Sequence, residues 1–181
     1  MKITKELVIK TASDIADQSG LNAVSLKAVA LTLSIKAPSL YNHIESLDSL
    51  LRSVAHAGMR EMNRLMAEAA VGKSGTDALD AVGIAYLDFM IEHPGVYETI
   101  QWGTWHGTAE TSEIYSGYTS LLKKILTPFQ FTVREDEVVQ ILAGMLHGYT
   151  TIQLKNAFTN AASVRKNLCT AVQALINGLL R

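Results

Sequence analysis

Apolar residues recur at intervals of three and four positions along almost the whole chain. In the first segment Val8, Ala12, Ile15 and Ala16 follow this spacing, which places them on one face of a helix. Gly20 comes next and is a typical helix end. Strand-like alternation of apolar and polar residues bounded by turn pairs is absent from the sequence. The pattern therefore predicts an all-α fold of about nine helices.

Helix-capping residues and breaks divide this pattern into separate elements. Ser25 can cap a short helix over residues 26–33, and Ser46 can cap a long helix from residue 47 to about residue 70. The segment VGKSGTD, residues 71–77, breaks the pattern and is the best linker candidate. The other expected helices are residues 76–92, a helix ended by Pro128, a helix from a Thr132–Glu135 capping box to about residue 158, and a last helix opened by Ser163.

The stretch APSLYNHI, residues 37–44, reads as a short helix with a proline in its first turn, where proline is tolerated. Leu40 and Ile44 are four residues apart and can anchor this helix on a core. Two short helices preceded by a longer one form a helix-turn-helix, whose second short helix enters the DNA major groove. We expect Tyr41 and His43 to reach phosphates and Asn42 to reach a base or a phosphate.

Composition and charge agree with a folded protein that is not generally basic. The chain has 181 residues, 48% of them hydrophobic and 18% charged, with a formal net charge of −1. Residues 1–52 carry a net charge of +1 and the remainder −2, which has the right sign for DNA binding near the N-terminus. Cys169 lies among apolar residues and fits a reducing compartment. We expect a cytoplasmic protein with no signal peptide and no membrane partner.

The segment AVSLKAVALTLSIKAPSLYNHIESLDSLL, with its small–Pro–small–Leu–Tyr–x–His run, resembles the DNA-binding domain of the tetracycline-repressor (TetR) family of bacterial transcriptional regulators. The resemblance extends from about Lys5 to Leu51, with the helix-turn-helix motif at about residues 25–44. It implies a DNA-backbone contact by Ser25 and Lys27, a groove-facing position for Lys36, Ala37 and Ser39, and phosphate contacts by Tyr41 and His43.

Three positions depart from the family pattern. Ser34 stands in the turn where a glycine is usual, so the serine must adopt a backbone conformation that glycine adopts more easily. Leu47 replaces a lysine that is often found just past the recognition helix, and Glu45 adds a local negative charge. These departures predict weaker non-specific DNA affinity.

The remainder of the chain resembles the C-terminal part of such regulators. The runs HPGVYE, WGTWHG and AGMLHGYTTIQLKNAF are similar to a C-terminal subtype named for its Trp-His-Gly motif. This resemblance implies an effector cavity and a dimer interface. We therefore expect a DNA-binding domain at residues 1–52, a connecting helix and linker at 53–74, and a ligand-binding and dimerisation domain at 75–181.

Aromatic and thioether side chains in this C-terminal part can line an apolar cavity with a few polar tips. For any one of them, packing in the core is the alternative. The candidate ligand-binding residues are Tyr86, Met90, Trp102, Trp105, His106, Tyr118, Met145 and His147.

His93, His106 and His147 raise the question of a metal site. No two of them have the four-residue helical spacing, and no cysteine or carboxylate cluster completes a site, so we expect no metal and no cofactor. Gly144 and Gly148 permit close helix approach, and the last two helices of two chains could form a four-helix dimer interface.

The sequence thus predicts a ligand-responsive regulator, in which a dimer binds a palindromic operator as a repressor and a small molecule releases it. The long helix that follows the recognition helix would act as the lever. Two alternatives stay open. One is an all-α enzyme that uses His106 or His147 with Glu or Asp partners, although the sequence shows no set of nucleophile, base and orienting residue. The other is a DNA-binding protein that does not respond to a ligand.

Overall fold

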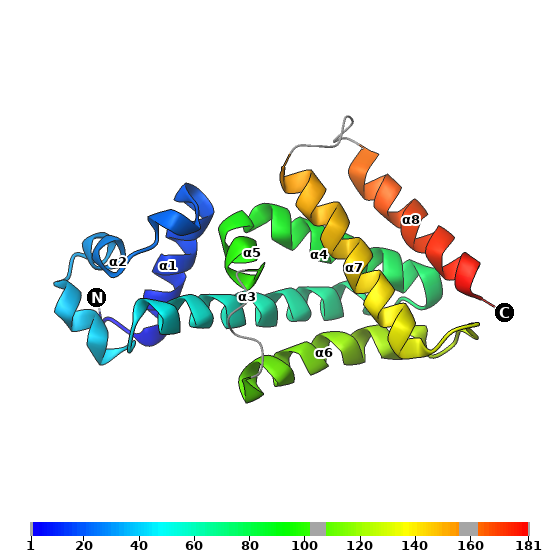
Figure 1. Ribbon diagram of the computed structural model, residues 1–181, viewed down its shortest axis with the longest axis horizontal. Coiled ribbons are helices and arrows are strands. Elements are labelled where there is room, and N and C mark those ends of the chain that lie inside the picture. Colours follow the sequence, from blue (N-terminus) through cyan, green and yellow to red (C-terminus); the bar gives the residue numbers. More distant parts are fainter. Residues whose placement is uncertain (1, 102–107, 156–162, 181) are drawn as a thin grey trace. The chain divides into compact units, whose positions relative to one another are not determined.

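The computed structural model describes residues 2–101, 108–155 and 163–180. These residues form helices joined by short connections, with one isolated backbone bridge between Phe131 and Leu180 (Figure 1). The expected all-α fold is confirmed. The α-helices are α1 (Lys5–Ser19), α2 (Leu26–Thr32), α3 (Leu47–Ala69), α4 (Gly75–Glu92), α5 (Pro94–Gln101), α6 (Ala109–Leu126), α7 (Glu135–Leu154) and α8 (Val164–Leu179), and the 3₁₀-helices are η1 (Leu21–Ala23) and η2 (Ala37–Asn42).

Contacts within the chain divide it into two compact units. The first unit consists of residues 1–60 and 92–111, and the second consists of residues 61–91 and 112–181. Helix α5 therefore belongs to the same unit as α1 and α2, although about thirty residues of the second unit separate them in sequence. Helix α3 runs from one unit into the other, and the last residue of α4 lies in the first unit.

In the first unit, α1 packs against α5 and α2, and α2 packs against η2. The helix starts are fixed by hydroxyl caps, as the sequence predicts. The Ser25 hydroxyl accepts the N–H of Ala28 at 3.1 Å, and the Ser46 hydroxyl accepts the N–H of Ser49 at 3.0 Å. Leu40 anchors η2 because its side chain is fully buried. The caps and the buried Leu40 thus fix α2 and η2 on the core of the first unit.

In the second unit, α7 packs against α8, and both lie close to α4. Gly83 of α4 allows this approach, since a Cβ atom there would lie 3.3 Å from Leu146 and 3.8 Å from Leu168. An ion pair between Arg165 and Asp88, 2.7 Å long, joins α8 to α4. In the part of the chain that the structure describes, no helix combines the length and the apolarity needed to cross a bilayer.

One expected helix is present in a different form, and one expected helix start is wrong. The segment at residues 37–42 forms a 3₁₀-helix rather than an α-helix, with the N–H of Ser39 bonded to the carbonyl of Lys36 at 2.9 Å. The helix expected to start at Thr132 starts at Glu135, with Arg134 and Glu137 in the capping positions. The N–H and the hydroxyl of Thr132 both donate to the Leu179 carbonyl, so Thr132 is bonded to the end of α8 and lies two residues before the N-cap of α7.

Candidate functional site

The eight residues expected to contact DNA all lie at the start of α2, in η2 or beside it, and each side chain is at least partly exposed. Tyr41 has 58% of its surface exposed. Ser25 uses one lone pair to cap α2, which leaves its O–H to donate to a phosphate. The structure brings together Ser25, Lys27, Lys36, Ala37, Ser39, Tyr41, Asn42 and His43 through the packing of α2 on η2.

The turn between α2 and η2 is a Schellman motif centred on Ser34. The N–H of Ile35 bonds to the carbonyl of Ala30 at 2.9 Å, and the N–H of Ser34 bonds to the carbonyl of Leu31 at 3.0 Å. Ser34 has a φ of +56°, the left-handed conformation that glycine usually supplies. The expectation for Ser34 is therefore confirmed, and the turn keeps its shape without glycine.

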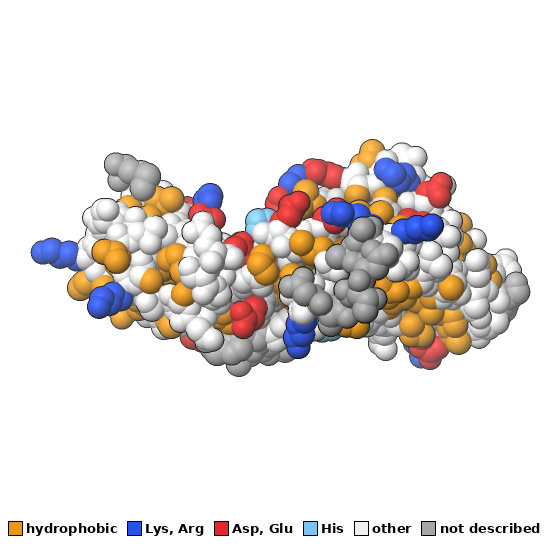
Figure 2. Space-filling model, turned by 90° about the horizontal axis from the view of Figure 1, so that it is seen from above, with side chains coloured by type: hydrophobic (Ala, Val, Ile, Leu, Met, Phe, Trp, Pro, Cys, Tyr) orange, Lys and Arg blue, Asp and Glu red, His pale blue; other side chains and the backbone are white. Residues whose placement is uncertain are grey.

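A polar groove of about 380 Å³ opens beside Tyr41, Asn42 and His43. Lys5 of α1 and Arg52 of α3 also line it, and neither was expected from the sequence to contact DNA. Arg52 is paired with Asp48 at 3.3 Å. Lys5 and Arg52 become candidates for phosphate contacts only through the fold, because no sequence spacing relates them to the recognition helix. On the face drawn in Figure 2, exposed charged side chains of both signs are present.

His56 of α3 is a buried histidine, 2% exposed, which the sequence did not single out. Its Nδ1 lies 3.1 Å from a carboxylate oxygen of Glu110, and its Nε2 lies 2.9 Å from the hydroxyl of Thr111. Since the ionised carboxylate only accepts, Nδ1 carries the hydrogen and Nε2 accepts from Thr111. Thr108, whose hydroxyl caps α6 by accepting the Thr111 N–H at 3.1 Å, completes the network. The network therefore ties the first turn of α6 to α3.

Burial lowers the pKa of His56, and the nearby Glu110 opposes this effect. The hydrogen bond from Arg60, 2.5 Å long, holds the pKa of Glu110 below its usual range. The order Thr111, His56, Glu110 matches a nucleophile, a base and an orienting acid. However, Thr111 is only 3% exposed, so a substrate does not reach its hydroxyl and the network reads as structural.

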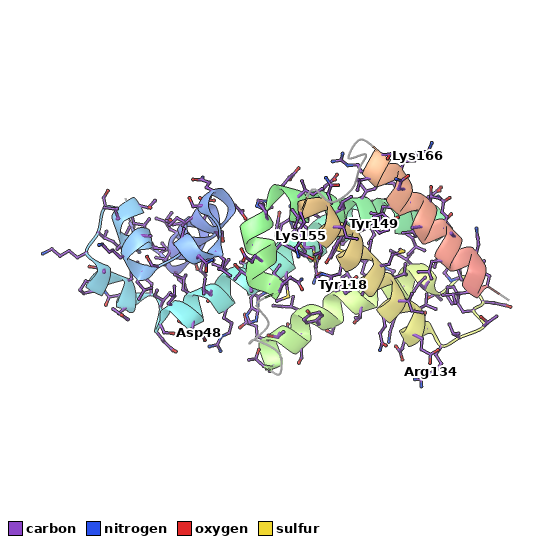
Figure 3. All side chains as sticks on the ribbon, turned by 45° about the horizontal axis from the view of Figure 1, so that its top comes forward. Asp48, Tyr118, Arg134, Tyr149, Lys155 and Lys166 are labelled. Atoms are coloured by element: carbon purple, nitrogen blue, oxygen red, sulfur yellow. The ribbon has the colours of Figure 1, made fainter. Side chains whose placement is uncertain are left out.

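Of the expected ligand-binding residues, Tyr86 and Met90 of α4 and Tyr118 of α6 are buried. Figure 3 shows Tyr118 on α6. Burial raises the pKa of Tyr118 well above its ordinary value. Met145 and His147 of α7 are half-buried. The remaining candidates, Trp102, Trp105 and His106, lie outside the described residues, as does the Trp105-His106-Gly107 motif.

The second unit also contains buried polar atoms that find no hydrogen-bond partner among the described residues. Three of them are the side-chain amide oxygens of Asn63 and Gln153 and the hydroxyl oxygen of Thr150. Thr150 has no exposed surface. A buried polar atom without a partner costs free energy, on the order of 1–3 kcal/mol. All three atoms can accept a hydrogen bond, and the sequence carries no signal for them.

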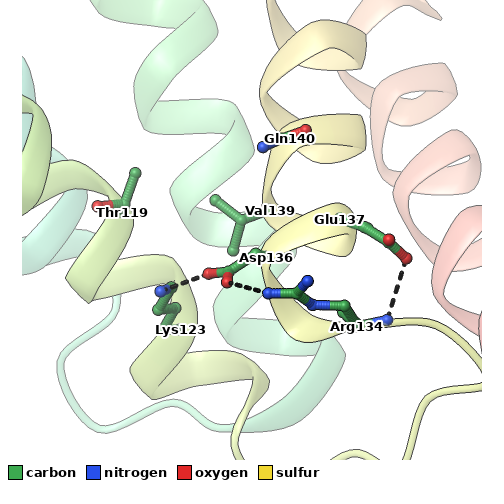
Figure 4. A pocket seen from close by; sticks show the side chains of 7 residues that line it. All are labelled: Thr119, Lys123, Arg134, Asp136, Glu137, Val139 and Gln140. Carbon is green, nitrogen blue, oxygen red and sulfur yellow. Dashed lines mark hydrogen bonds and ion pairs between the residues drawn. The ribbon is translucent and has the colours of Figure 1, made fainter.

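A separate pocket of about 440 Å³ lies between α6 and α7 (Figure 4). Asp136 stands in its middle, 2.5 Å from the Lys123 ammonium and 3.5 Å from the Arg134 guanidinium. Lys123 holds the pKa of Asp136 below its usual range, first by a hydrogen bond and then by its charge. The charges that line this pocket thus satisfy one another, and the expected ligand residues do not line it.

The exposed faces of α7 and α8 carry apolar and small residues. Ile141 and Ile152 of α7 are 44% and 41% exposed. A Cβ atom added at Gly144, Gly148 or Gly178 would meet nothing within 4 Å, so these glycines open onto free surface in the single chain. Another protein surface could approach the helix backbones closely at these positions.

Comparison with known proteins agrees with this geometry. Residues 79–175, more than half of the chain, match the family described as "Tetracyclin repressor-like, C-terminal domain". The chain is 29% identical over 180 residues to the uncharacterised HTH-type transcriptional regulator YobS of Bacillus subtilis (strain 168). That alignment covers 98% of this chain and 93% of YobS.

Solved structures share the fold. A protein of unknown function from Rhodococcus sp. RHA1 has a TM-score of 0.87 at 15% identity, covering 100% of this chain and 97% of that chain. A TetR variant from Acinetobacter baumannii AYE, solved in complex with minocycline, has a TM-score of 0.74 at 16% identity and covers 98% of this chain and 96% of that chain. The helix-turn-helix, the matched C-terminal domain and the regulator relatives lead to one conclusion: the chain belongs to the TetR family of transcriptional regulators.

Proposed function

We propose that this regulator is a repressor that binds a palindromic operator as a homodimer and is released by a small-molecule effector. The observation that carries the proposal is the recognition helix η2, on which Tyr41 and Asn42 stand exposed beside His43 while Leu40 is buried behind them. In this proposal residues 1–52 bind DNA, residues 53–74 connect, and residues 75–181 bind the effector and the second chain. No enzymatic activity is part of it.

DNA binding uses two kinds of contact. Tyr41 and His43 bond to phosphates together with Ser25 and Lys27, which fixes the position of η2 on the duplex. Residues at the start of η2, namely Lys36, Ala37 and Ser39, then face the base edges. Asn42 is able to bond to either a base or a phosphate.

The dimer is formed by the exposed faces of α7 and α8. Support comes from the open glycines and the exposed isoleucines on these helices, which a second copy would cover. Dimerisation also places two recognition helices about 34–36 Å apart, which is the spacing of half-sites on one face of DNA.

The effector binds within the second unit, among Tyr86, Met90, Tyr118, Met145 and His147, with Trp102, Trp105 and His106 as further candidates. The unpartnered acceptors at Asn63, Thr150 and Gln153 support a ligand that donates hydrogen bonds. The related TetR variant from Acinetobacter baumannii binds minocycline in its crystal structure, which supports a small-molecule site in this fold without identifying the effector of this chain. Bound effector would favour a dimer with wrongly spaced recognition helices, with α3 as the lever.

The test begins with a DNA duplex obtained by selection from a random pool against the full-length protein. We expect Tyr41→Ala to weaken binding of that duplex by about ten-fold, equivalent to about 1.4 kcal/mol. Fluorescence anisotropy measures the affinity. Tyr115→Ala is the matched control, because Tyr115 is a partly exposed tyrosine of α6. Equal affinity of wild type and Tyr41→Ala would remove η2 from the interface.

Effector control is tested separately with a compound library. A true effector raises the melting temperature of the protein and releases the selected duplex. By thermodynamic linkage, the duplex must weaken effector binding by the same factor. A compound that binds equally well with and without the duplex contradicts the release mechanism.

A further inference from the structure

Asp17, near the end of α1, holds the junction between α4 and α5. One oxygen of its carboxylate accepts the N–H groups of Gly95 and Val96, each at 2.9 Å. The other oxygen lies 2.8 Å from Nδ1 of His93, the residue that joins the two helices. One side chain of α1 therefore makes three bonds within four consecutive positions of another part of the chain.

The junction lies directly against the α1 backbone. A Cβ atom at Gly95 would overlap the carbonyl group of Ala16, so the first turn of α5 can sit here only with glycine at this position. Near the end of α1, the N–H of Leu21 also reaches the Glu98 carboxylate at 3.4 Å. The carboxylate of Asp17 satisfies N–H groups that have no partner inside α5, and it carries the charge that a helix N-terminus favours.

Helix α4 carries two of the proposed effector residues towards this junction. Met90 lies three residues before His93, and Tyr86 lies seven residues before it, on the same uninterrupted helix. Because a helix moves as a stiff rod over two turns, a shift at these residues displaces His93 and the start of α5. Asp17 then passes the displacement to α1, which packs against α2, and α2 packs against η2.

We propose that Asp17 is a positioning residue that couples the effector-binding helices to the recognition helix through α1, as a route additional to the lever helix α3. This proposal rests on the proposed function and names the residues that would connect the effector-binding helices to η2. The chain of contacts runs from α4 through the His93–Val96 junction to α1, α2 and η2, and each link is a hydrogen bond, a continuous helix or a packing contact within the first unit.

The experiment uses the full-length protein and the selected duplex, so that no effector is needed. Coupling is reciprocal, which means that DNA bound at η2 must alter the helices that hold the effector. Hydrogen–deuterium exchange read by mass spectrometry reports both regions at once. In wild type we expect the duplex to slow exchange in α1, α2 and η2 and to change exchange in α6 and α7.

In Asp17→Ala we expect the affinity for the duplex to stay within about three-fold of wild type, which corresponds to a change in binding free energy of less than about 1 kcal/mol. The duplex-induced change in α6 and α7 should fall to less than about half of the wild-type change. Asp14→Ala is the matched control, since Asp14 is an exposed acid of the same helix that pairs locally with Lys10. It should respond like wild type in both regions.

Asp17→Asn guards against a folding defect in the alanine variant, because its amide oxygen still accepts the N–H groups of α5 while an NH₂ group replaces the oxygen that faces His93. We expect an intermediate response in α6 and α7. An undiminished response in both Asp17 variants overturns the coupling role. A wild-type response confined to α1, α2 and η2 also overturns it, although DNA binding then still supports the proposed function. Failure of the wild type to select any duplex contradicts the proposed function itself, and the coupling with it.

Discussion

At position 34 the chain carries a serine in a backbone conformation that glycine adopts at lower cost. The Schellman bonds around it are intact, with distances of 2.9 and 3.0 Å, so the turn imposes the conformation on the serine. An L-residue in the left-handed region costs about 1–2 kcal/mol. The turn that sets the angle between α2 and η2 is therefore slightly destabilised in the folded protein.

Ser34→Gly should raise the free energy of unfolding by up to about 1 kcal/mol, because relief of this strain exceeds the extra chain entropy of glycine. Urea denaturation followed by circular dichroism measures the change. Ser34→Ala separates the backbone from the hydroxyl, since alanine keeps the Cβ atom. Equal stabilisation by alanine and glycine would contradict the backbone explanation.

A residue with a special structural role can be predicted from the sequence when that role depends on its neighbours in the chain. Ser34 could be selected because a turn position has a definite backbone requirement, and Ser25 because a cap acts on its own helix. His56 could not be selected, since a lone histidine in the run SVAHAGM gives no sign of its partners. Those partners, Glu110 and Thr111, lie more than fifty positions away and meet it only in the fold.

At the scale of elements, α3 is a helix on which several long-range contacts depend. Its start is fixed by Ser46 and Ser49, which cap each other's backbone N–H groups at 3.0 Å. Further along the helix, the His56 network attaches the start of α6 to it. Helix α3 therefore connects the residues that follow η2 to the first turn of α6.

This network predicts a pH dependence of stability. Burial lowers the pKa of His56 in the folded state, whereas the unfolded chain has a value of about 6.5. As the pH falls through that value the unfolded state binds the proton first, so the free energy of unfolding should decrease by up to about 1.4 kcal/mol per pH unit between the two pKa values. Urea denaturation at about pH 7.5 and at about pH 5.5, about one unit on either side of the unfolded-state pKa, measures the change in the free energy of unfolding.

His56→Gln should be less stable at neutral pH but should lose less stability on acidification than wild type does. Equal losses of stability on acidification for wild type and His56→Gln would contradict the predicted pKa difference, because they would show that His56 binds protons equally in the folded and unfolded states.

Element boundaries were predictable where capping is local and wrong where tertiary contacts decide. The ends at Ser19 and Glu92 follow from Gly20 and from the HPG break at residues 93–95. The start of α7 is set instead by α8, whose Leu179 carbonyl engages Thr132. The 3₁₀ form of η2 likewise depends on its packing against α2, which its own six residues do not encode.

For the molecule as a whole, the question is how the exposed α7 and α8 faces are used. In the proposed dimer Ile141 of α7, 44% exposed in the single chain, is covered by the second copy. Ile141→Asp should therefore dissociate the dimer, because a carboxylate would be buried without a partner. Sedimentation velocity measures the association state. The monomer should also bind the selected duplex at least about ten-fold more weakly, since it engages only one half-site while the dimer engages two.

Val71→Asp is the control for that substitution. Val71 is 74% exposed at the end of α3, outside α7 and α8, so the added charge should change neither assembly nor DNA binding. A dimeric Ile141→Asp protein would place the interface elsewhere on the chain.

The membership of α5 in the first unit also affects how the protein is made. The residues that complete the surroundings of α1 lie 76 to 79 positions after Asp17, beyond the whole of α3 and α4. During synthesis the first sixty residues leave the ribosome without the helix that packs against α1. The part of the protein that reads DNA is therefore finished only when residues up to about 111 have emerged. Nascent chains that end before α5 lack the surface that holds α1 in place, so the segment that recognises DNA is not fully supported until α3, α4 and α5 have all been translated.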